Sequence, residues 1–399
     1  MVLWTGVFVA GQPSDPLPRA TPASVGVRAD PLAASMVILR HDVDRGRIAG
    51  AVAMLARNGR LVHTAAVGYQ DLESHAPMTE RTLFRIYSMT KPVTAVAVMM
   101  LFEQQRFTLD EPVSRYLPEF ASVVVQDGDG RSHAPVRPVS IRDLLLHTSG
   151  LNHRTSDLYQ QARVRSRSIA LPQFIRNITE VPLMEDPGTR YRYSESTTVL
   201  GRLVEIWSGQ PFDAFLEERI FMPLRMVDTG FFATPTERSR LATVYAPTSG
   251  GGLHPVEIEA LPFTEPPALL EGAVGLLSTG ADFLRFSQML LNRGELDGVR
   301  LLRTGTVDEM VVNGLPGPVL AVRGGAMGWG LGNVNVVMKP EALRYPANRG
   351  EYGWDGTAGT IFWNDPTTNT VILLLTQNSP PDPDNLRQRF KTAIQSAMQ

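Results

Sequence analysis

The sequence predicts an α/β protein of the α+β type, in which a central antiparallel sheet flanked by helices is joined to a second, mainly helical domain. Strand-like segments occupy both ends of the chain, and the stretch between them alternates helical segments with long loops rich in proline and glycine. The 399 residues are 43% hydrophobic and 20% charged, an ordinary globular composition that suffices for a large core in one or two domains.

Residues 1–27 form a predicted N-terminal lead-in. The first ten residues, MVLWTGVFVA, are apolar, but they lack a basic region and a clean small-x-small cleavage pattern. We therefore expect no export signal and a cytoplasmic protein. No uninterrupted apolar run of about 18 residues occurs elsewhere, so no transmembrane helix is expected.

One part of the predicted sheet domain lies in residues 28–110. Apolar residues recur at helical spacing from Asp30 to a stop at Gly46, which predicts a first helix. Two strand-like runs then flank Asn58 and Gly59, a dipeptide typical of a tight hairpin turn.

The other part of the sheet domain lies in residues 275–399, and residues 111–274 form the predicted helical domain. The C-terminal part contains three strand segments, MGWGLGNVNVVM, EYGWDGTAGTIFWND and TVILLLTQN. The turn NDPTTN joins the last two into a hairpin, and a helix from about Asp384 to Ala397 closes the chain. The middle contains helical segments such as STTVLGRLVEIWSG and few strand candidates.

Composition excludes several classes of function. The net charge of −2 and the absence of basic runs with interleaved aromatic residues argue against nucleic acid and membrane partners. The chain has no cysteine, which excludes disulfides, thiolate metal sites and thiol nucleophiles. Its seven histidines form no H-x-x-x-H pair, so no zinc-protease site is indicated, and we predict neither a metal nor an organic cofactor.

Lysine is rare in this chain. It occurs only at Lys91, Lys339 and Lys391, which leaves 35 arginines among the 38 basic residues. Arginine is protonated at every physiological pH, whereas a lysine can lose its proton when it is buried. A lysine retained at position 91 therefore indicates a role that needs deprotonation.

The hexapeptide YSMTKP places Ser88 three residues before Lys91, and Pro92 fits the first turn of a long apolar helix predicted to start at Ser88. Residues three apart on a helix share a face, so Lys91 can activate Ser88 as a nucleophile. The alternative is that Ser88 only caps the helix and that Lys91 extends to solvent. That alternative leaves a charge at the head of an apolar helix, where burial is costly.

Other serine-hydrolase patterns are missing. No G-x-S-x-G sequence is present, so the nucleophile turn of the usual α/β-hydrolases is absent. His147, in LLLHTSG, is the histidine most worth following, and we expect it to fix a turn by hydrogen bonding rather than to act in catalysis.

The ordered series YSMTK, LLLHTSGL, PGTRYRYSES, GLLSTGADFLRFSQMLLN and YGWDGTAGTIFWNDP resembles the serine β-lactamase and penicillin-recognising superfamily. It is most similar to the class C β-lactamase-like esterases, the family VIII carboxylesterases. The resemblance covers roughly residues 28 to 399, and the combination is far more specific than any single motif. It implies a β-lactamase-like fold.

The resemblance also implies roles for individual residues. Ser88 matches the acylated nucleophile, Lys91 its activating partner, and Tyr193 the general base that later protonates the leaving group. The backbone N–H groups of Ser88 and Thr357 match the oxyanion hole. A tyrosine with a pKa near 10 is a useful base only beside a cation, because a shift of about three units requires about 4 kcal/mol. We expect Lys91 to be that cation and Gly356 to let substrate approach the strand closely.

Two departures from the family pattern concern the substrate-binding residues. Glu195 stands where β-lactamases carry asparagine, and we expect it to pair with Lys91, keep it charged and move the base role to Tyr193. Trp354 replaces the lysine of K-T-G, which would pair with a substrate carboxylate, so the site should favour uncharged esters over anionic β-lactams. Strand alternation should turn the neighbouring Asp355 away from the site.

The sequence thus predicts a serine esterase that hydrolyses small or medium uncharged esters through an acyl-enzyme. One alternative is an acyltransferase, amidase or weak β-lactamase that uses the same acyl-enzyme, and another is a catalytically silent penicillin-binding-like module. The expected partner is a small-molecule ester, and nothing in the sequence indicates an oligomeric state. Either an apolar acyl site or a plain core explains Phe221, Met222, Phe231 and Phe232.

Overall fold

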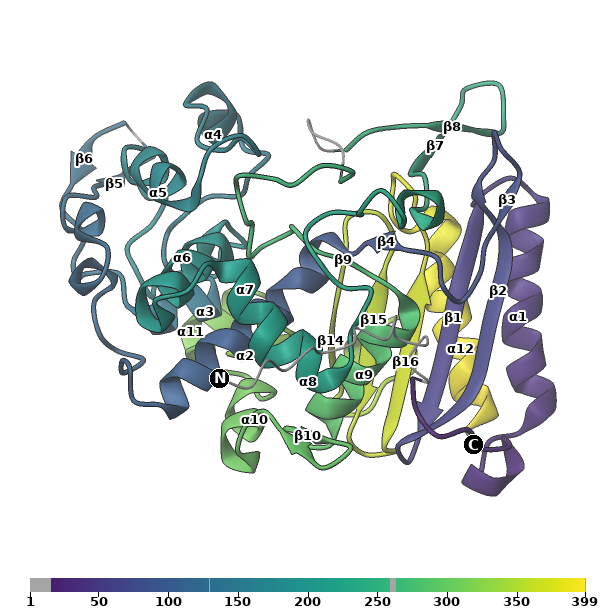
Figure 1. Ribbon diagram of the computed structural model, residues 1–399. Coiled ribbons are helices and arrows are strands. Elements are labelled where there is room, and N and C mark those ends of the chain that lie inside the picture. Colours follow the sequence, from purple (N-terminus) through teal and green to yellow (C-terminus); the bar gives the residue numbers. More distant parts are fainter. Residues whose placement is uncertain (1–15, 129, 259–262, 399) are drawn as a thin grey trace, which may run out of the picture.

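The computed structural model describes residues 16–128, 130–258 and 263–398 (Figure 1). A single large sheet forms its centre, and every neighbouring pair of strands in it is antiparallel, as predicted. In spatial order the strands are β12 (Met327–Trp329), β13 (Asn335–Val337), β14 (Tyr352–Asp355), β15 (Ile361–Asp365), β16 (Thr370–Leu375), β1 (Gly50–Arg57), β2 (Arg60–Asp71) and β3 (Ala76–Pro77).

The two ends of the chain meet in the middle of this sheet. Strand β16 pairs with β1, so that Leu373 lies opposite Met54. Residues of both strands are buried on the two faces, which is why they read as continuous apolar runs rather than alternating ones. The sheet is therefore complete only when its N-terminal and C-terminal strands come together.

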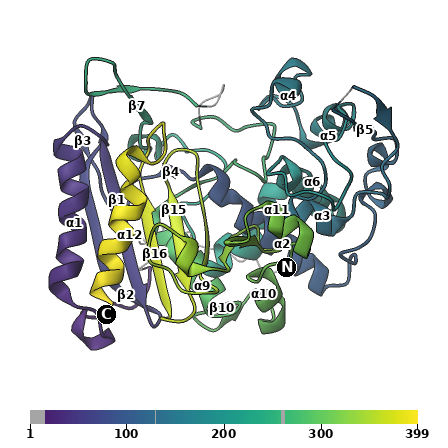
Figure 2. The ribbon, with the colours of Figure 1, turned by 180° about the vertical axis from the view of Figure 1, so that it is seen from behind.

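Helices cover both faces of the sheet. On one face lie α1 (Ala29–Asp44) and α12 (Leu386–Ala397), side by side in Figures 1 and 2. On the other face, α9 (Gly280–Leu291) packs on β1, β15 and β16. Helix α2 (Thr90–Glu103) belongs to the same core as α9 and also contacts α6 of the helical region. The predicted first and last helices are confirmed, with ends shifted by one or two residues.

Both predicted hairpins are present. Asn58 and Gly59 connect β1 to β2 with φ values of 55° and 71°, the left-handed conformation that a tight turn of this kind requires. The turn between β15 and β16 contains Asn369, whose φ is 52°.

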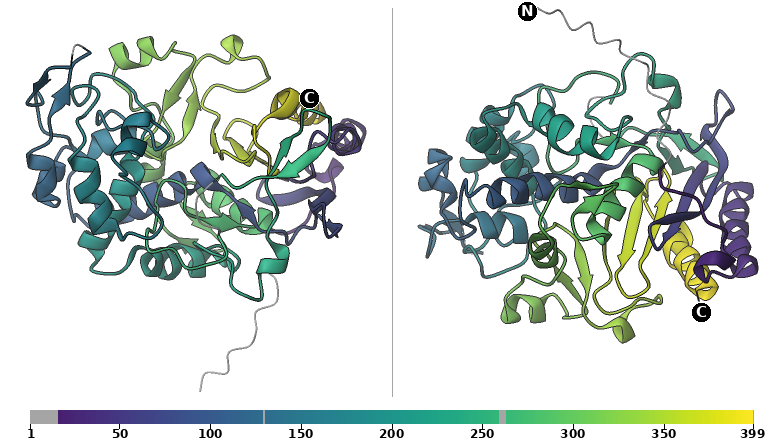
Figure 3. Two further views of the ribbon diagram at one scale, coloured as in Figure 1. Left: turned by 90° about the horizontal axis from the view of Figure 1, so that it is seen from above. Right: turned by 60° about the horizontal axis from the view of Figure 1, so that its bottom comes forward.

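The helical region lies to one side of the sheet (Figures 1 and 3). Its helices are α3 (Ile141–Leu146), α4 (Asp157–Gln161), α5 (Leu171–Thr179), α6 (Ser196–Ser208), α7 (Phe212–Leu216) and α8 (Met222–Leu224), with a π-helical turn at Glu217–Phe221. Its strand pair is β5 (Val125–Gln126) with β6 (Ser132–His133), whereas the pair of β7 (Tyr245–Pro247) and β8 (Leu253–Pro255) lies beside the sheet near β3, where Tyr245 bridges to Asn378 (Figure 1). The domain boundaries drawn near residues 110 and 275 stay a prediction.

The remaining elements are short. They are β4 (Phe84–Arg85), β9 (Leu277–Ser278), β10 (Glu295–Leu296), β11 (Val299–Arg300), α10 (Thr304–Met310) and α11 (Gly317–Val322). Among the described residues, no helix combines the length and the apolar character needed to cross a bilayer.

Candidate active site

Ser88 lies in a tight 3-10 turn, Tyr87–Met89, directly before α2. The helix itself begins at Thr90, two residues after the predicted start, and no side chain caps its N-terminus, so the alternative that Ser88 only caps the helix does not hold. Tyr87 has a φ of 41°, a strained conformation for a residue other than glycine. The turn removes the Ser88 hydroxyl from helix capping and leaves it for other partners.

Lys91 is 1% exposed, which excludes the alternative that it extends to solvent. Its Nζ lies 3.4 Å from Ser88 Oγ, donates to the Ala273 carbonyl oxygen at 3.0 Å, and sits 4.4 Å from the centre of the Tyr193 ring. Burial lowers the pKa of Lys91 to about 7, although Glu195 opposes this shift. Near neutral pH a large fraction of Lys91 is therefore a free amine next to the serine.

Tyr193 is the third candidate catalytic residue, and it lies in the loop before α6. Its hydroxyl oxygen accepts a hydrogen bond from Trp354 Nε1 at 3.1 Å. Burial raises the pKa of Tyr193, and hydrogen bonding with Ser88 and Trp354 offsets the rise only in part. The phenol thus stays protonated, which favours Lys91 over Tyr193 as the resting base.

Glu195 is 1% exposed, and its Oε2 accepts a hydrogen bond from Thr198 Oγ1 at 2.8 Å. Burial alone would raise its pKa, but the positive charges of Arg165, Lys91 and Arg154, together with the Thr198 hydrogen bond, outweigh burial and lower it. Although both side chains are described, Glu195 and Lys91 form no ion pair. The expectation that Glu195 pairs with Lys91 and keeps it charged does not hold, because the two interact only through space.

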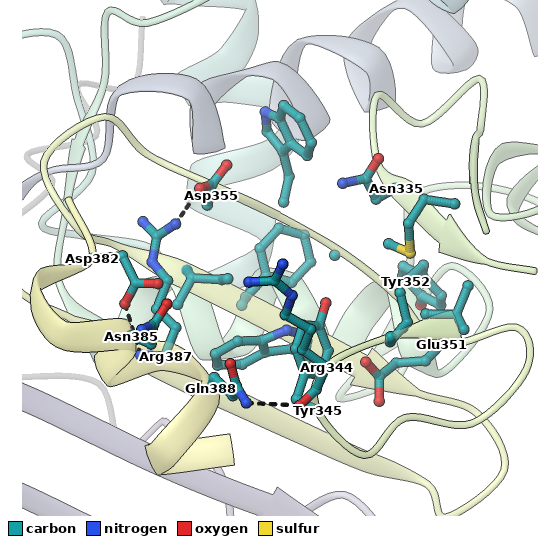
Figure 4. Close-up of a pocket in the computed structure, with 18 of the residues that line it drawn as sticks. Asn335, Arg344, Tyr345, Glu351, Tyr352, Asp355, Asp382, Asn385, Arg387 and Gln388 are labelled. Carbon is teal, nitrogen blue, oxygen red and sulfur yellow. Dashed lines mark hydrogen bonds and ion pairs between the residues drawn. The ribbon is translucent and has the colours of Figure 1, made fainter. Parts of the chain in front are cut away.

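Trp354 and Asp355 point to opposite faces of β14, as strand alternation predicts. Trp354 reaches Tyr193, whereas Asp355 pairs with Arg387 of α12 (Figure 4). Trp354, Asp355 and Arg387 all line a cavity of about 440 Å³ that none of Ser88, Lys91 and Tyr193 lines. The hydrogen bond to Tyr193 is what connects Trp354, and not Asp355, to the candidate active site.

Gly356 packs closely against the segment before Ser88. A Cβ at this position would lie 2.5 Å from the carbonyl oxygen of Ile86 and 2.3 Å from Thr360 Oγ1. Glycine therefore lets the chain just before Ser88 pack against the strand, and the expectation that it also lets substrate approach stays a prediction. This close packing sets the spacing between Ser88 and Thr357.

Thr357 follows in the turn after β14. Among the described residues its backbone N–H donates to no protein acceptor, as an oxyanion-hole donor requires. Its Oγ1 accepts a hydrogen bond from Arg154 Nη2 at 3.2 Å. Arg154 thus brings a positive charge from the helical region to the edge of the site.

His147 is fully buried at the end of α3, with a φ of 54°. Its Nδ1 accepts a hydrogen bond from the Ser194 backbone N–H at 3.3 Å, next to Tyr193. Burial keeps its pKa well below the usual range, so it stays neutral. His147 fixes the loop that carries Tyr193, which agrees with the interpretation as a turn-fixing histidine.

Sequence reasoning missed three residues at the candidate site. The His153 ring stacks on Tyr193 with centroids 5.7 Å apart, Trp329 lies 6.1 Å away edge-on, and Arg154 follows His153 in the same loop. The only available signal for His153 and Arg154 was their place shortly after LLLHTSGL, from which Asn152 separates them. In the part of the chain that the structure describes, no three His, Asp or Glu side chains are grouped to hold a metal ion.

The fold and the site together define the class of the protein. An antiparallel sheet covered by helices meets a helical region at a Ser-x-x-Lys turn, and a buried tyrosine and a free backbone N–H complete the arrangement of a β-lactamase-like serine hydrolase. The model of the Beta-lactamase family matches residues 38–396, and the chain belongs to that family.

Its relatives include named enzymes. Esterase EstB of Burkholderia gladioli is 31% identical over 366 residues, which cover 84% of this chain and 87% of that protein. Protein Rv1367c of Mycobacterium tuberculosis is 34% identical over 364 residues, covering 86% and 89%. The solved structure of EstCE1, described as a hydrolase with promiscuous acyltransferase activity, has a TM-score of 0.80 at 27% identity, covering 91% and 98%. The protein is thus a serine hydrolase similar to family VIII esterases.

Proposed function

We propose that the protein hydrolyses small or medium uncharged carboxylic esters through an acyl-enzyme on Ser88. The observation that carries this proposal is the contact of a buried, partly neutral Lys91 with Ser88 Oγ at 3.4 Å. A serine hydroxyl becomes a useful nucleophile only when a nearby base accepts its proton. The name of the relative EstB, an esterase, supports the same reaction.

Acylation begins when Lys91 Nζ takes the Ser88 proton and Oγ bonds to the ester carbonyl carbon. The carbonyl oxygen becomes an oxyanion, which the backbone N–H groups of Ser88 and Thr357 stabilise. Donors of this kind typically contribute about 3 kcal/mol each to the transition state.

The alkoxide leaves when the ester carbon–oxygen bond breaks. Tyr193, kept protonated by burial, donates its proton to that oxygen and regains one from the Lys91 ammonium, which lies over its ring. Deacylation then uses water as the nucleophile. Lys91 takes a proton from water, the hydroxide attacks the acyl carbon, and Ser88 Oγ leaves with a proton.

Trp354 supports the preference for uncharged esters. It occupies the place of the lysine in K-T-G, its indole donates to Tyr193, and it offers a substrate carboxylate no charge. We expect faster turnover of a p-nitrophenyl ester than of a chromogenic cephalosporin.

Acyl transfer to an alcohol is the second candidate, since the described function of EstCE1 includes it. An amidase, a weak β-lactamase and a silent binding module remain the less favoured alternatives. Transfer differs from hydrolysis only in which molecule attacks the acyl carbon, so both use the same acyl-enzyme.

A panel of p-nitrophenyl esters graded by acyl length, assayed on wild type and Ser88→Ala, tests the proposal. Wild type should show turnover that Ser88→Ala loses, and a fluorophosphonate should add mass to Ser88. Faster cephalosporin hydrolysis would overturn the preference for esters, and failure of Ser88 to label would favour the silent module. Adding an alcohol and measuring the new ester separates transfer from hydrolysis.

A further inference from the structure

The four apolar residues that suggested an acyl site do come together, but away from the candidate active site. Phe221, Met222, Phe231 and Phe232 line one groove of about 420 Å³, which none of Ser88, Lys91 and Tyr193 lines. A volume of this size is typical of a small-molecule site. Phe221 and Phe231 also belong to the hydrophobic core, so the plain-core explanation holds for these two, and none of the four residues shares this groove with the catalytic groups.

The groove is apolar and partly open to solvent. Met222 and Val227 are 67% and 59% exposed, although large apolar side chains are usually covered. Phe221 and Phe231 are the buried part of its lining, and Pro266 also lines it. The π-helical turn Glu217–Phe221 carries one wall, and turns of this type are frequent at functional sites.

The charges at the groove have one sign. Its described lining contains four carboxylates, and no lysine or arginine: Asp213, Glu217, Asp228 and Glu237. Arg240, from outside the groove, pairs with Asp228 and Glu237. Among the described residues, Asp213 and Glu217 form no ion pair, and their spacing of four places them on one helical face.

Aromatic rings next to carboxylates that form no ion pair are suited to binding a cationic ligand. The face of a phenylalanine ring attracts a cation, and quaternary ammonium groups are bound in this way when rings and acidic groups surround them. A ligand that carries a carboxylate would be repelled by the negative charge of the groove. A neutral ligand would gain no electrostatic attraction from it.

We propose that this groove binds an organic ammonium ion with an apolar body. Asp213 and Glu217 attract the cation, Phe232 and its neighbouring rings face the ammonium group, and Met222 and Val227 contact the apolar body. Residues 270–277 separate the groove from Lys91: Leu270 and Leu277 line the groove, whereas the Ala273 carbonyl oxygen accepts from Lys91. Binding should consequently be independent of Ser88 and of the proposed esterase function.

Calorimetric titration with hexyltrimethylammonium tests the proposal, with hexanesulfonate and hexanol as the anionic and neutral comparisons. The ammonium ion should bind best, and more weakly at 0.5 M salt than at low salt, because partly exposed charges are screened. The Ser88→Ala variant should bind it with unchanged Kd, which separates this site from the ester site. Equal binding of hexanol or hexanesulfonate would overturn the proposal.

Variants locate the site. Asp213→Asn combined with Glu217→Gln should raise the Kd of hexyltrimethylammonium at least fivefold, and Phe232→Leu should raise it severalfold while keeping an apolar side chain. Glu218→Gln is the matched control, because Glu218 is exposed on the same turn but outside the lining, and it should leave Kd unchanged. A Kd within twofold of wild type in the double variant, with an unchanged melting temperature, would place the ligand elsewhere.

Discussion

Trp354 Nε1 donates a hydrogen bond to the Tyr193 hydroxyl oxygen over 3.1 Å and so joins the central sheet to the helical region at the candidate active site. The two rings lie 5.2 Å apart at their centres. From the sequence, Trp354 is notable only because it replaces the lysine of K-T-G. In the structure it also orients Tyr193, the proposed proton donor.

Trp354→Phe tests this role. The ring remains but its N–H is lost, so the Tyr193 hydroxyl is oriented less well, and we expect kcat for a p-nitrophenyl ester to fall about tenfold, equivalent to about 1.4 kcal/mol. Trp207→Phe is the control, because the buried Trp207 ring stacks on Phe107 and, within the described part of the chain, forms no ring contact or hydrogen bond with Tyr193. An equal effect of both substitutions on kcat would contradict the role.

Lys91→Arg should abolish most ester hydrolysis. Arginine keeps the positive charge but cannot give up its proton, so Ser88 loses its base, and we expect kcat to fall by about 10³ or more. Lys339→Arg, at an exposed position, should leave kcat unchanged. Retention of more than a tenth of wild-type kcat in Lys91→Arg would show that another group is the base.

The pH dependence follows from the state of Lys91. Its pKa is lowered to about 7, and the free amine is the active form, so kcat/KM should rise with pH through a midpoint near 7 and level off well above it. Glu195 raises the pKa of Lys91, so Glu195→Gln should move the midpoint to lower pH. A pH profile that is the same in wild type and Glu195→Gln would remove Glu195 from the mechanism.

Gly356→Ala should separate the two halves of the oxyanion hole. The new Cβ would clash with the Ile86 carbonyl oxygen, so the turn of Ser88 must shift away from Thr357. We expect a loss of activity of about 100-fold, comparable to the loss of one oxyanion donor. Gly305→Ala is the control: its Cβ meets no atom within 4 Å, and alanine in α10 should stabilise the fold by about 0.5–1 kcal/mol. Unchanged activity in Gly356→Ala would refute this packing argument.

Asp282 should make stability depend on pH. Burial raises its pKa to about 7 in the folded protein, above the usual value of 3.8, so the folded state retains a proton that the unfolded state releases. Its contribution is complete below pH 4 and is lost as pH rises through about 7. Urea unfolding at pH 5 and pH 8 should show a smaller difference in free energy of unfolding for Asp282→Asn than for wild type, and an identical difference would exclude Asp282 as the cause.

Local pattern was enough for much of the fold. The Asn58-Gly59 turn and the apolar runs at both ends of the chain predict hairpins that the structure contains. A tight turn requires particular residue types, and burial on both faces requires apolar ones, so both features can be recognised in the sequence. The alternation of side chains along a strand also predicted that Trp354 and Asp355 point to opposite faces of β14, where they contact Tyr193 and Arg387 respectively. The domain boundaries have no such local mark.

The candidate site also has features that the sequence predicts and features that only the structure shows. By itself the sequence determined the Ser88 and Lys91 spacing, the resemblance that selected Tyr193, and the loss of the K-T-G cation. Only the tertiary structure decided that Lys91 approaches neutrality, since its pKa depends on burial by segments far away in the chain. It also decided that Gly356 packs on Ile86 and that the four apolar residues, for which the sequence left an acyl site and a plain core open, line a separate groove. The residues of one segment do not specify which distant segment it contacts.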